Sequence, residues 1–125
     1  MNYDNDDKLK NMSLYSYKMD NKLCTVAENF CNDLCSNGTN GNIGSDGSTL
    51  TERLKKENIK LDEYSESILY GYNNPIEIVN NLIIDRYSKN EKNKKNIFNP
   101  NFTKVGIALM NHIAYRFCCV IIYGK

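Results

Sequence analysis

The hydrophobic pattern is clearest in residues 22–35, where apolar side chains recur with the period of an α-helix. The positions are Leu23, Val26, Ala27, Phe30, Cys31 and Leu34. This spacing places all six on one helical face and predicts that the face packs against a core. Asp20 or Asn21 can cap the first turn, and Gly38 lies just beyond the last one.

A second amphipathic helix is predicted over residues 74–87. Asn74 is a favourable N-cap, Pro75 suits the first helical position, and Glu77 follows in the first turn. Its predicted inner stripe consists of Val79, Leu82, Ile83, Arg86 and Tyr87. Between the two helices lie a glycine-rich loop over residues 37–48 and a short helix over residues 49–56, which begins with a Thr-x-x-Glu capping box.

The C-terminal region has the alternating pattern of β-strands. Pro100, which has no N–H, marks a turn, and residues 93–108 lead from a loop into a predicted central strand. The apolar positions that alternate after the turn are Val105, Ile107 and Leu109. We predict strands over residues 104–110 and 113–123, joined by a turn at 111–112. Helices followed by a strand pair indicate an α+β fold.

Composition limits the function classes. The chain has 125 residues and a formal net charge of +1, which predicts one domain without the basic surface of a nucleic-acid-binding protein. Residues 1–21 lack periodicity and are predicted to be a flexible tail before a domain over residues 22–125. The lysine-rich stretch 89–95 is expected to be a solvated loop, and no apolar run is long enough to span a membrane.

Twenty of the residues are asparagine and five are cysteine, at positions 24, 31, 35, 118 and 119. We interpret the asparagine excess as biased composition. None of the cysteines forms a Cys-x-x-Cys pair, so zinc-ribbon and thioredoxin-like sites are excluded. Cys31 and Cys35 are one helical turn apart with nearly parallel Cβ directions, a poor geometry for a disulfide. Two interpretations stay open: small buried side chains, or one disulfide from this helix to Cys118 or Cys119.

Three motifs occur in a distinctive order along the chain. The glycine-rich loop ends in GSDGS at residues 44–48, residues 66–71 read ESILYG, and residues 96–102 read NIFNPNF. In this order and spacing they resemble the CAP superfamily, the cysteine-rich secretory proteins with an SCP domain, over residues 22–123. The resemblance implies an α-β-α sandwich with a small antiparallel sheet. The family's usual first helix is not recognisable, so the chain is expected to be a truncated domain.

The resemblance also implies a cleft. Family members place two histidines and two acidic residues there, and some bind a zinc-like ion. Carried over by position, the histidines fall on Asn42 and Asn93 and the acids on Glu66 and Asp85. An asparagine side chain has no titratable nitrogen and is a poor zinc ligand. We therefore expect no catalytic residues, no zinc and no cofactor.

Two further predictions concern the cleft, one for His112 and one for the pair Glu66 and Asp85. His112, the only histidine, resembles a family segment and is expected to be a cleft neighbour with a structural role. Glu66 and Asp85, without imidazolium partners, are predicted either to bind a hard cation such as Ca²⁺ or Mg²⁺ or to accept hydrogen bonds from backbone and water.

The resemblance implies a non-enzymatic domain that binds a lipid, a sterol or a protein partner through apolar grooves. The alternatives are a structural or adhesive domain with a degenerate cleft, and a metal-dependent hydrolase. The family is usually extracellular, but the polar N-terminus MNYDNDDK is not typical of a signal peptide. Either a leader lies outside this sequence or the chain is not secreted.

Overall fold

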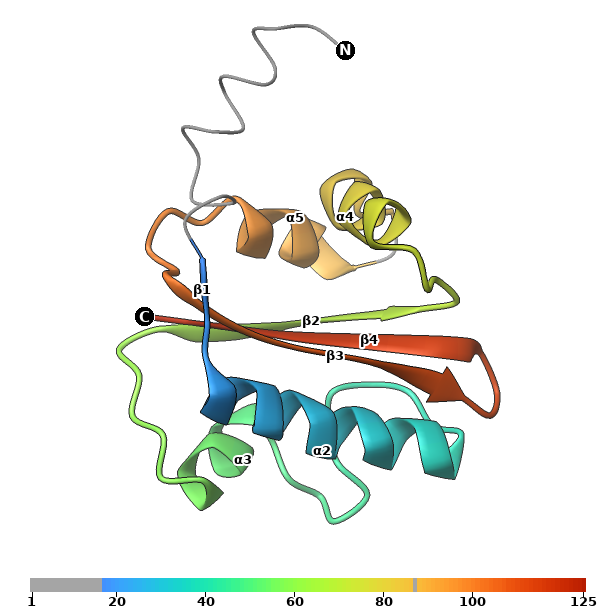
Figure 1. The fold of residues 1–125 in the computed structure, drawn as a ribbon, viewed down its shortest axis with the longest axis horizontal. Coiled ribbons are helices and arrows are strands. Elements are labelled where there is room, and N and C mark those ends of the chain that lie inside the picture. The colour runs from blue at the N-terminus through green and yellow to red at the C-terminus, as the bar shows by residue number, and fades with distance from the viewer. Residues whose placement is uncertain (1–16, 87) are drawn as a thin grey trace, which may run out of the picture.

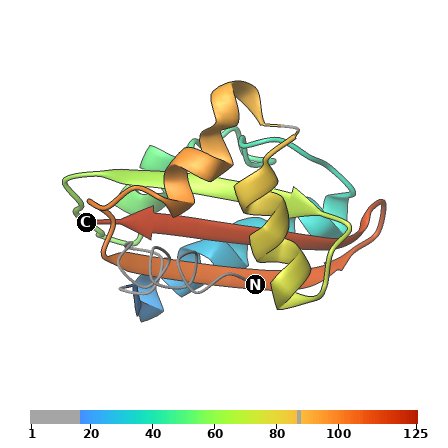
Figure 2. The ribbon, with the colours of Figure 1, turned by 90° about the horizontal axis from the view of Figure 1, so that it is seen from above.

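The computed structural model describes residues 17–86 and 88–125, which form three layers with a β-sheet in the middle (Figure 1). Helices α2 (Asn21–Asn37) and α3 (Leu50–Lys56) cover one face of the sheet. Helices α4 (Pro75–Ile84) and α5 (Lys92–Ile97), preceded by the 3₁₀ turn η2 (Lys89–Glu91), cross the other face (Figure 2). The predicted α+β sandwich is therefore confirmed.

The sheet has four strands in the order β1-β3-β4-β2. They are β1 (Lys18–Met19), β2 (Tyr64–Tyr70), β3 (Lys104–His112) and β4 (Arg116–Gly124). Strand β4 pairs antiparallel with β2 and β3, whereas β1 pairs parallel with β3. The predicted central strand and its hairpin partner are confirmed, but the turn lies at residues 113–115 instead of 111–112. Strands β1 and β2 were not predicted.

Each face of the sheet has its own core. The α2 side buries Leu23, Val26, Ala27, Phe30, Cys31, Leu34, Cys35, Leu54, Ala108, Cys118, Val120 and Ile122. The α4 and α5 side buries Ile78, Leu82, Ile97, Phe102, Val105, Cys119, Ile121 and Tyr123. Successive β4 side chains point to opposite faces and both faces are covered, so this strand reads as a continuous apolar run.

The structure differs from the prediction in which face of strand β3 is buried. The alternating residues Ile107 and Leu109 are 39% and 42% exposed, whereas Gly106 and Ala108 lie buried against α2. A Cβ atom on Gly106 would lie 2.2 Å from the carbonyl carbon of Leu23. The missing side chain therefore lets α2 approach the strand backbone closely. The large residues of the alternation face the less covered side of the sheet.

Helix α4 is shorter than predicted because Asp85 adopts a left-handed conformation (φ 48°) that ends it. Of its predicted inner stripe, Leu82 is buried and Ile83 half-buried, but Val79 and Arg86 are exposed and Ile78 takes the second buried position. Position 87 lies outside the described residues.

Two predicted segments of irregular chain contain regular structure. The lysine-rich stretch 89–95 is not a loop, since η2 and α5 occupy it, but its four lysines are exposed as predicted and only Asn93 of the stretch is buried. The domain also begins before residue 22. Strand β1 pairs with β3, and the Asp20 side chain caps α2 by accepting a hydrogen bond from the Leu23 N–H.

Candidate functional site

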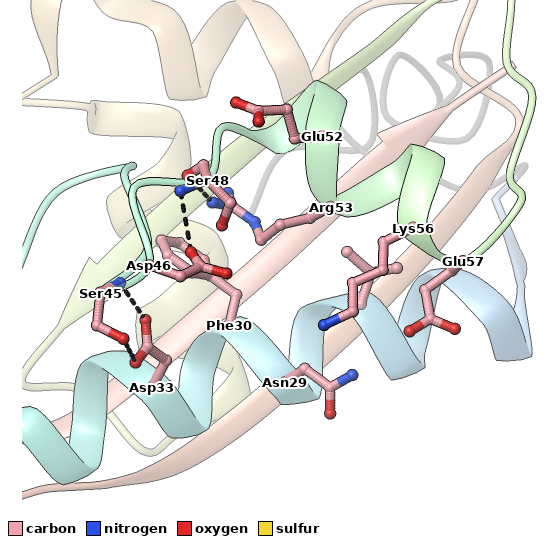
Figure 3. Close-up of a pocket in the computed structure, with 11 residues that line it drawn as sticks. Asn29, Phe30, Asp33, Ser45, Asp46, Ser48, Glu52, Arg53, Lys56 and Glu57 are labelled. Carbon is pink, nitrogen blue, oxygen red and sulfur yellow. Dashed lines mark hydrogen bonds between the residues drawn. The ribbon is translucent and has the colours of Figure 1, made fainter.

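The glycine-rich loop is fastened to helix α2 by Asp33 (Figure 3). Its Oδ2 accepts a hydrogen bond from the Ser45 N–H at 2.7 Å, and its Oδ1 accepts one from Ser45 Oγ at 2.6 Å. Within the loop, Asp46 Oδ1 accepts from the Ser48 N–H, and the hydrogen bonds from Ser48 lower the pKa of Asp46. This network gives the loop a fixed path toward α3.

Arg53 connects this loop to the sheet. Its guanidinium lies 3.6 Å from the centre of the Phe30 ring and donates to the carbonyl oxygens of Ser48 at 2.8 Å and Asn42 at 3.3 Å. It also forms a salt bridge with Glu66 at 3.2 Å. The exposed residue Asn42 therefore takes part through its backbone carbonyl.

The buried carboxylate of Glu66 has a positively charged partner in Arg53. Burial raises the pKa of Glu66, and the guanidinium opposes this increase. The sequence analysis predicted a hard cation as one option because the cleft lacks the imidazolium groups that could balance the charge of its carboxylates. Arg53 already balances the charge of Glu66, so this carboxylate does not require a cation.

Asp85 and Asn93 form a second hydrogen-bonded group. Asp85 Oδ1 accepts from Ser88 Oγ and its Oδ2 accepts from the Lys94 N–H at 2.9 Å, while the Asn93 N–H donates to Ser88 Oγ. Burial of Asp85 opposes ionisation, but the hydrogen bonds from Ser88 and Lys94 outweigh it and hold the pKa of this carboxyl below its ordinary value. The Asp85 carboxylate, in the connection between α4 and α5, therefore has its hydrogen-bond donors within that same segment.

Asn96 links the two groups; it is the first residue of the NIFNPNF motif, and the sequence analysis gave it no role of its own. Its Nδ2 donates to the Glu66 carbonyl and to Ser67 Oγ, both at 3.2 Å, and so fastens α5 to the edge strand β2. Asn93 lies one helical turn earlier. Hydrogen bonds therefore connect the four predicted positions in two pairs, Asn42 with Glu66 through Arg53, and Asp85 with Asn93 through Ser88. The sequence signal for Asn96 was its position at the start of the NIFNPNF motif.

His112 ends strand β3 and is buried. Its Nδ1 accepts hydrogen bonds from the N–H groups of Ala114 and Tyr115, so its Nε2 carries the proton and donates to the Thr39 carbonyl at 2.8 Å. Its ring packs edge-on against Tyr70, whose hydroxyl accepts from the Gly41 N–H. Both ring nitrogens are engaged in holding the β3–β4 turn and the glycine-rich loop.

The side of the sheet that faces α4 carries an apolar groove of about 470 Å³. It is lined by Tyr17, Met19, Pro75, Ile78, Val79, Leu82, Ile97, Val105, Ile107, Leu109, Cys119, Ile121 and Tyr123. Met19 is 59% exposed and Val79 is 36% exposed. The sequence analysis expected apolar grooves only from the resemblance, although the exposed alternation of β3 forms one wall of this one.

Tyr123 is the polar residue buried in this groove. Burial raises the pKa of its hydroxyl, and nearby Ser67 has a smaller, opposing effect. Within the described residues the hydroxyl nevertheless has no partner at hydrogen-bond geometry. Buried hydroxyl groups in folded proteins are usually paired, so a ligand group that could pair with this one would be favoured.

The sequence matches the family model of the cysteine-rich secretory proteins (CAP) over residues 9–123. The chain belongs to the CAP family. The match begins well before residue 22, in agreement with the early start of the fold. None of the curated protein sequences is significantly similar to this CAP domain.

Solved structures with the same fold include an outer surface protein of Borrelia burgdorferi, with a TM-score of 0.75 and 18% identity over 100% of this chain and 96% of that protein. An extracellular SCP-domain protein of Bacillus anthracis gives 0.68 and 18% over 87% of this chain. A cysteine-rich secretory protein of Staphylococcus aureus gives 0.69 and 15% over 94%. The chain spans 34% of each of the last two proteins.

No helix among residues 17–86 and 88–125 of this CAP domain has the length and apolar character needed to cross a membrane.

Proposed function

We propose that this chain is a non-catalytic CAP domain that binds a sterol-class lipid in the apolar groove between α4 and β3. The observation that carries the proposal is a groove whose lining is apolar apart from tyrosine hydroxyls, with several lining side chains left partly exposed. Covering these side chains with an apolar ligand removes them from water and favours binding by about 25 cal/mol per Å².

The cleft residues support a role without catalysis. A general base must be free to take a proton from a substrate. Glu66 is held by Arg53, Asp85 accepts from Ser88 and Lys94, and His112 uses both ring nitrogens within the fold. The family positions Asn42 and Asn93 carry amides, which do not titrate.

The size and floor of the groove favour a small lipid over a protein partner. Its volume of about 470 Å³ lies within the usual range for small-molecule sites, about 300–1,000 Å³. A sterol combines a rigid apolar body with one hydroxyl. That hydroxyl would reach Tyr123 Oη only after the groove side chains move apart, because Tyr123 is only 1% exposed in this structure. A fatty acid would bring a carboxylate to the same apolar floor, at a higher cost of desolvation.

The test is a fluorescence titration with dehydroergosterol, a fluorescent sterol, against the wild-type chain and matched variants. We expect saturable one-to-one binding. Leu109→Asp places a charge in the groove wall and should weaken binding about tenfold or more, since a lost Leu contact is worth at least about 1.5 kcal/mol. Ile113→Asp is the control, because Ile113 is 75% exposed and does not line the groove.

A parallel titration with palmitate distinguishes a sterol from a fatty acid. The proposal is wrong if the sterol does not saturate, or if Leu109→Asp and Ile113→Asp bind it as tightly as wild type. A structural or adhesive role would give the first of these results.

A further inference from the structure

Three cysteine thiols converge in the core on the α2 side of the sheet. Cys31 and Cys35 come from successive turns of α2, and Cys118 comes from the start of β4. Their Sγ atoms all lie within 4.8 Å of one another, and those of Cys31 and Cys35 are 3.9 Å apart. All three residues are buried, with exposed fractions of 0%, 4% and 0%.

This spacing is close to that of three sulfurs around one metal ion. With metal–sulfur bonds of about 2.3 Å, three sulfurs in a plane around the ion are about 4.0 Å apart. The cluster meets this distance at one pair and needs only a small contraction at the others. We propose that Cys31, Cys35 and Cys118 form a binding site for one soft monovalent metal ion of the Cu(I) class.

The donor set favours Cu(I) over zinc. Thiolate and thioether sulfurs select soft ions, whereas structural zinc almost always takes four ligands in a tetrahedron. Among the described residues, the cluster offers three thiols. Met110 pairs with Cys118 across strands β3 and β4 and packs against the same core, which places a thioether side chain on this face of the sheet. The imidazole of His112 is engaged elsewhere.

Binding must release thiol protons. Burial raises the pKa of Cys35 to about 11, contact with Cys31 and burial raise the pKa of Cys118, and contact with Cys118 lowers the pKa of Cys31. In the metal-free chain Cys35 and Cys118 are therefore neutral thiols near pH 7. One Cu(I) replaces the thiol protons of Cys31, Cys35 and Cys118, which pass to solvent and leave a net charge of −2 on the complex. No electron transfer is required because copper enters and stays as Cu(I).

A disulfide within the cluster is the main alternative. Bonded sulfurs are about 2.05 Å apart, far closer than the 3.9 Å between Cys31 and Cys35, and their Cβ atoms leave one helix in nearly parallel directions. The disulfide to Cys118 or Cys119 that the sequence left open is not formed in this structure, where all five cysteines are free thiols. A metal ion bridges the existing distances.

The experiment titrates the reduced full chain with Cu(I), held in equilibrium with the chromogenic chelator bicinchoninate under argon. We expect one Cu(I) per chain to be withdrawn from the chelator. Single variants Cys31→Ala and Cys118→Ala should each lose at least tenfold in affinity. Cys119→Ala, a buried cysteine on the opposite face of the sheet, and Cys24→Ala should bind as wild type does.

Copper X-ray absorption on the wild-type complex makes the test independent of whether the variants fold. We expect three sulfur neighbours, or four if Met110 joins, at about 2.2–2.4 Å. The proposal is overturned by any of three results: no copper withdrawn from the chelator, a first shell of nitrogen or oxygen, or binding that survives loss of Cys31 and Cys118. A non-reduced chain lighter by two hydrogens, with the disulfide mapped within the trio, would also overturn it.

Discussion

Replacing Arg53 with methionine should expose how strongly the cleft depends on its internal salt bridge. Methionine keeps the apolar contact with Phe30 but removes the charge beside Glu66 and the three hydrogen bonds to the carbonyls of Ser48 and Asn42. The side chains of Arg53 and Glu66 are only 10% and 3% exposed, so water cannot replace the lost partner easily.

The structure sets the size of the effect. Two charges 3.2 Å apart attract by about 5 kcal/mol at an effective dielectric constant of about 20. Removing one partner of a buried pair typically costs about 3–5 kcal/mol, because the other charge stays buried. We therefore expect Arg53→Met to lower the free energy of unfolding by about 3–5 kcal/mol near pH 7. The melting temperature should fall by roughly 10–20 °C.

The loss should depend on pH. Burial already raises the pKa of Glu66 above its ordinary value of 4.5, so ionised Glu66 lowers stability as the pH rises through its pKa in the folded state. Without Arg53 that pKa rises further. The difference in stability between wild type and Arg53→Met should therefore be smallest below about pH 4, where Glu66 is protonated in the folded and unfolded forms of both proteins. It should grow toward neutral pH.

Urea unfolding at several pH values, followed by circular dichroism, measures this directly. Lys55→Met is the matched control, because it removes an exposed charge from the same helix and should change stability by less than about 0.5 kcal/mol. Arg53→Met/Glu66→Gln should recover most of the loss. A cost below about 1 kcal/mol for Arg53→Met that does not vary with pH would refute the reasoning.

Three further predictions concern other parts of the fold. Gly106→Ala should lower the free energy of unfolding by about 3 kcal/mol or more in urea unfolding, because its Cβ would overlap the α2 backbone, whereas Gly47→Ala, with open space but a φ of 82°, should cost only about 1–2 kcal/mol. Equal losses would contradict the close helix–strand contact. His112→Ala should cost about 2–3 kcal/mol and raise amide exchange in residues 113–115, since it leaves hydrogen-bonding groups unpaired; unchanged exchange would argue against its structural role. Calorimetry should detect no sub-micromolar Zn²⁺ site at Asn42 and Asn93 in the wild type, and heat from such a site would show that the cleft is intact as a metal centre.

Some parts of this fold could be predicted because their signals are local. The stripe of α2 repeats every three or four residues, and Asn74 and Pro75 mark the start of α4 by capping chemistry alone. The β3–β4 pair followed from its apolar alternation, although Ile107 and Leu109 proved to face the less covered side. Which face is buried depends on where α2 packs, and Gly106 allows the helix backbone to approach β3 on that face.

Other parts depend on contacts between distant residues and were missed for that reason. Strand β2 is polar at its start and gains its place by pairing with β4. In the sequence, α5 resembles a solvated lysine-rich loop, and only the structure shows the hydrogen bond that joins Asn96 to β2. The candidate site shows the same limit: motif positions identified Glu66 and Asp85, but only the tertiary structure shows that Arg53 and Ser88 satisfy them.

The central claim is that the functional surface of this CAP domain is the apolar groove beside α4. Photo-crosslinking with a diazirine sterol, followed by peptide mapping, tests it most directly. The account predicts labelling of groove residues such as Val79 and Leu109, and competition by unlabelled sterol should suppress it. Labelling confined to peptides around Glu66 or His112, or labelling that excess sterol does not reduce, would contradict the account.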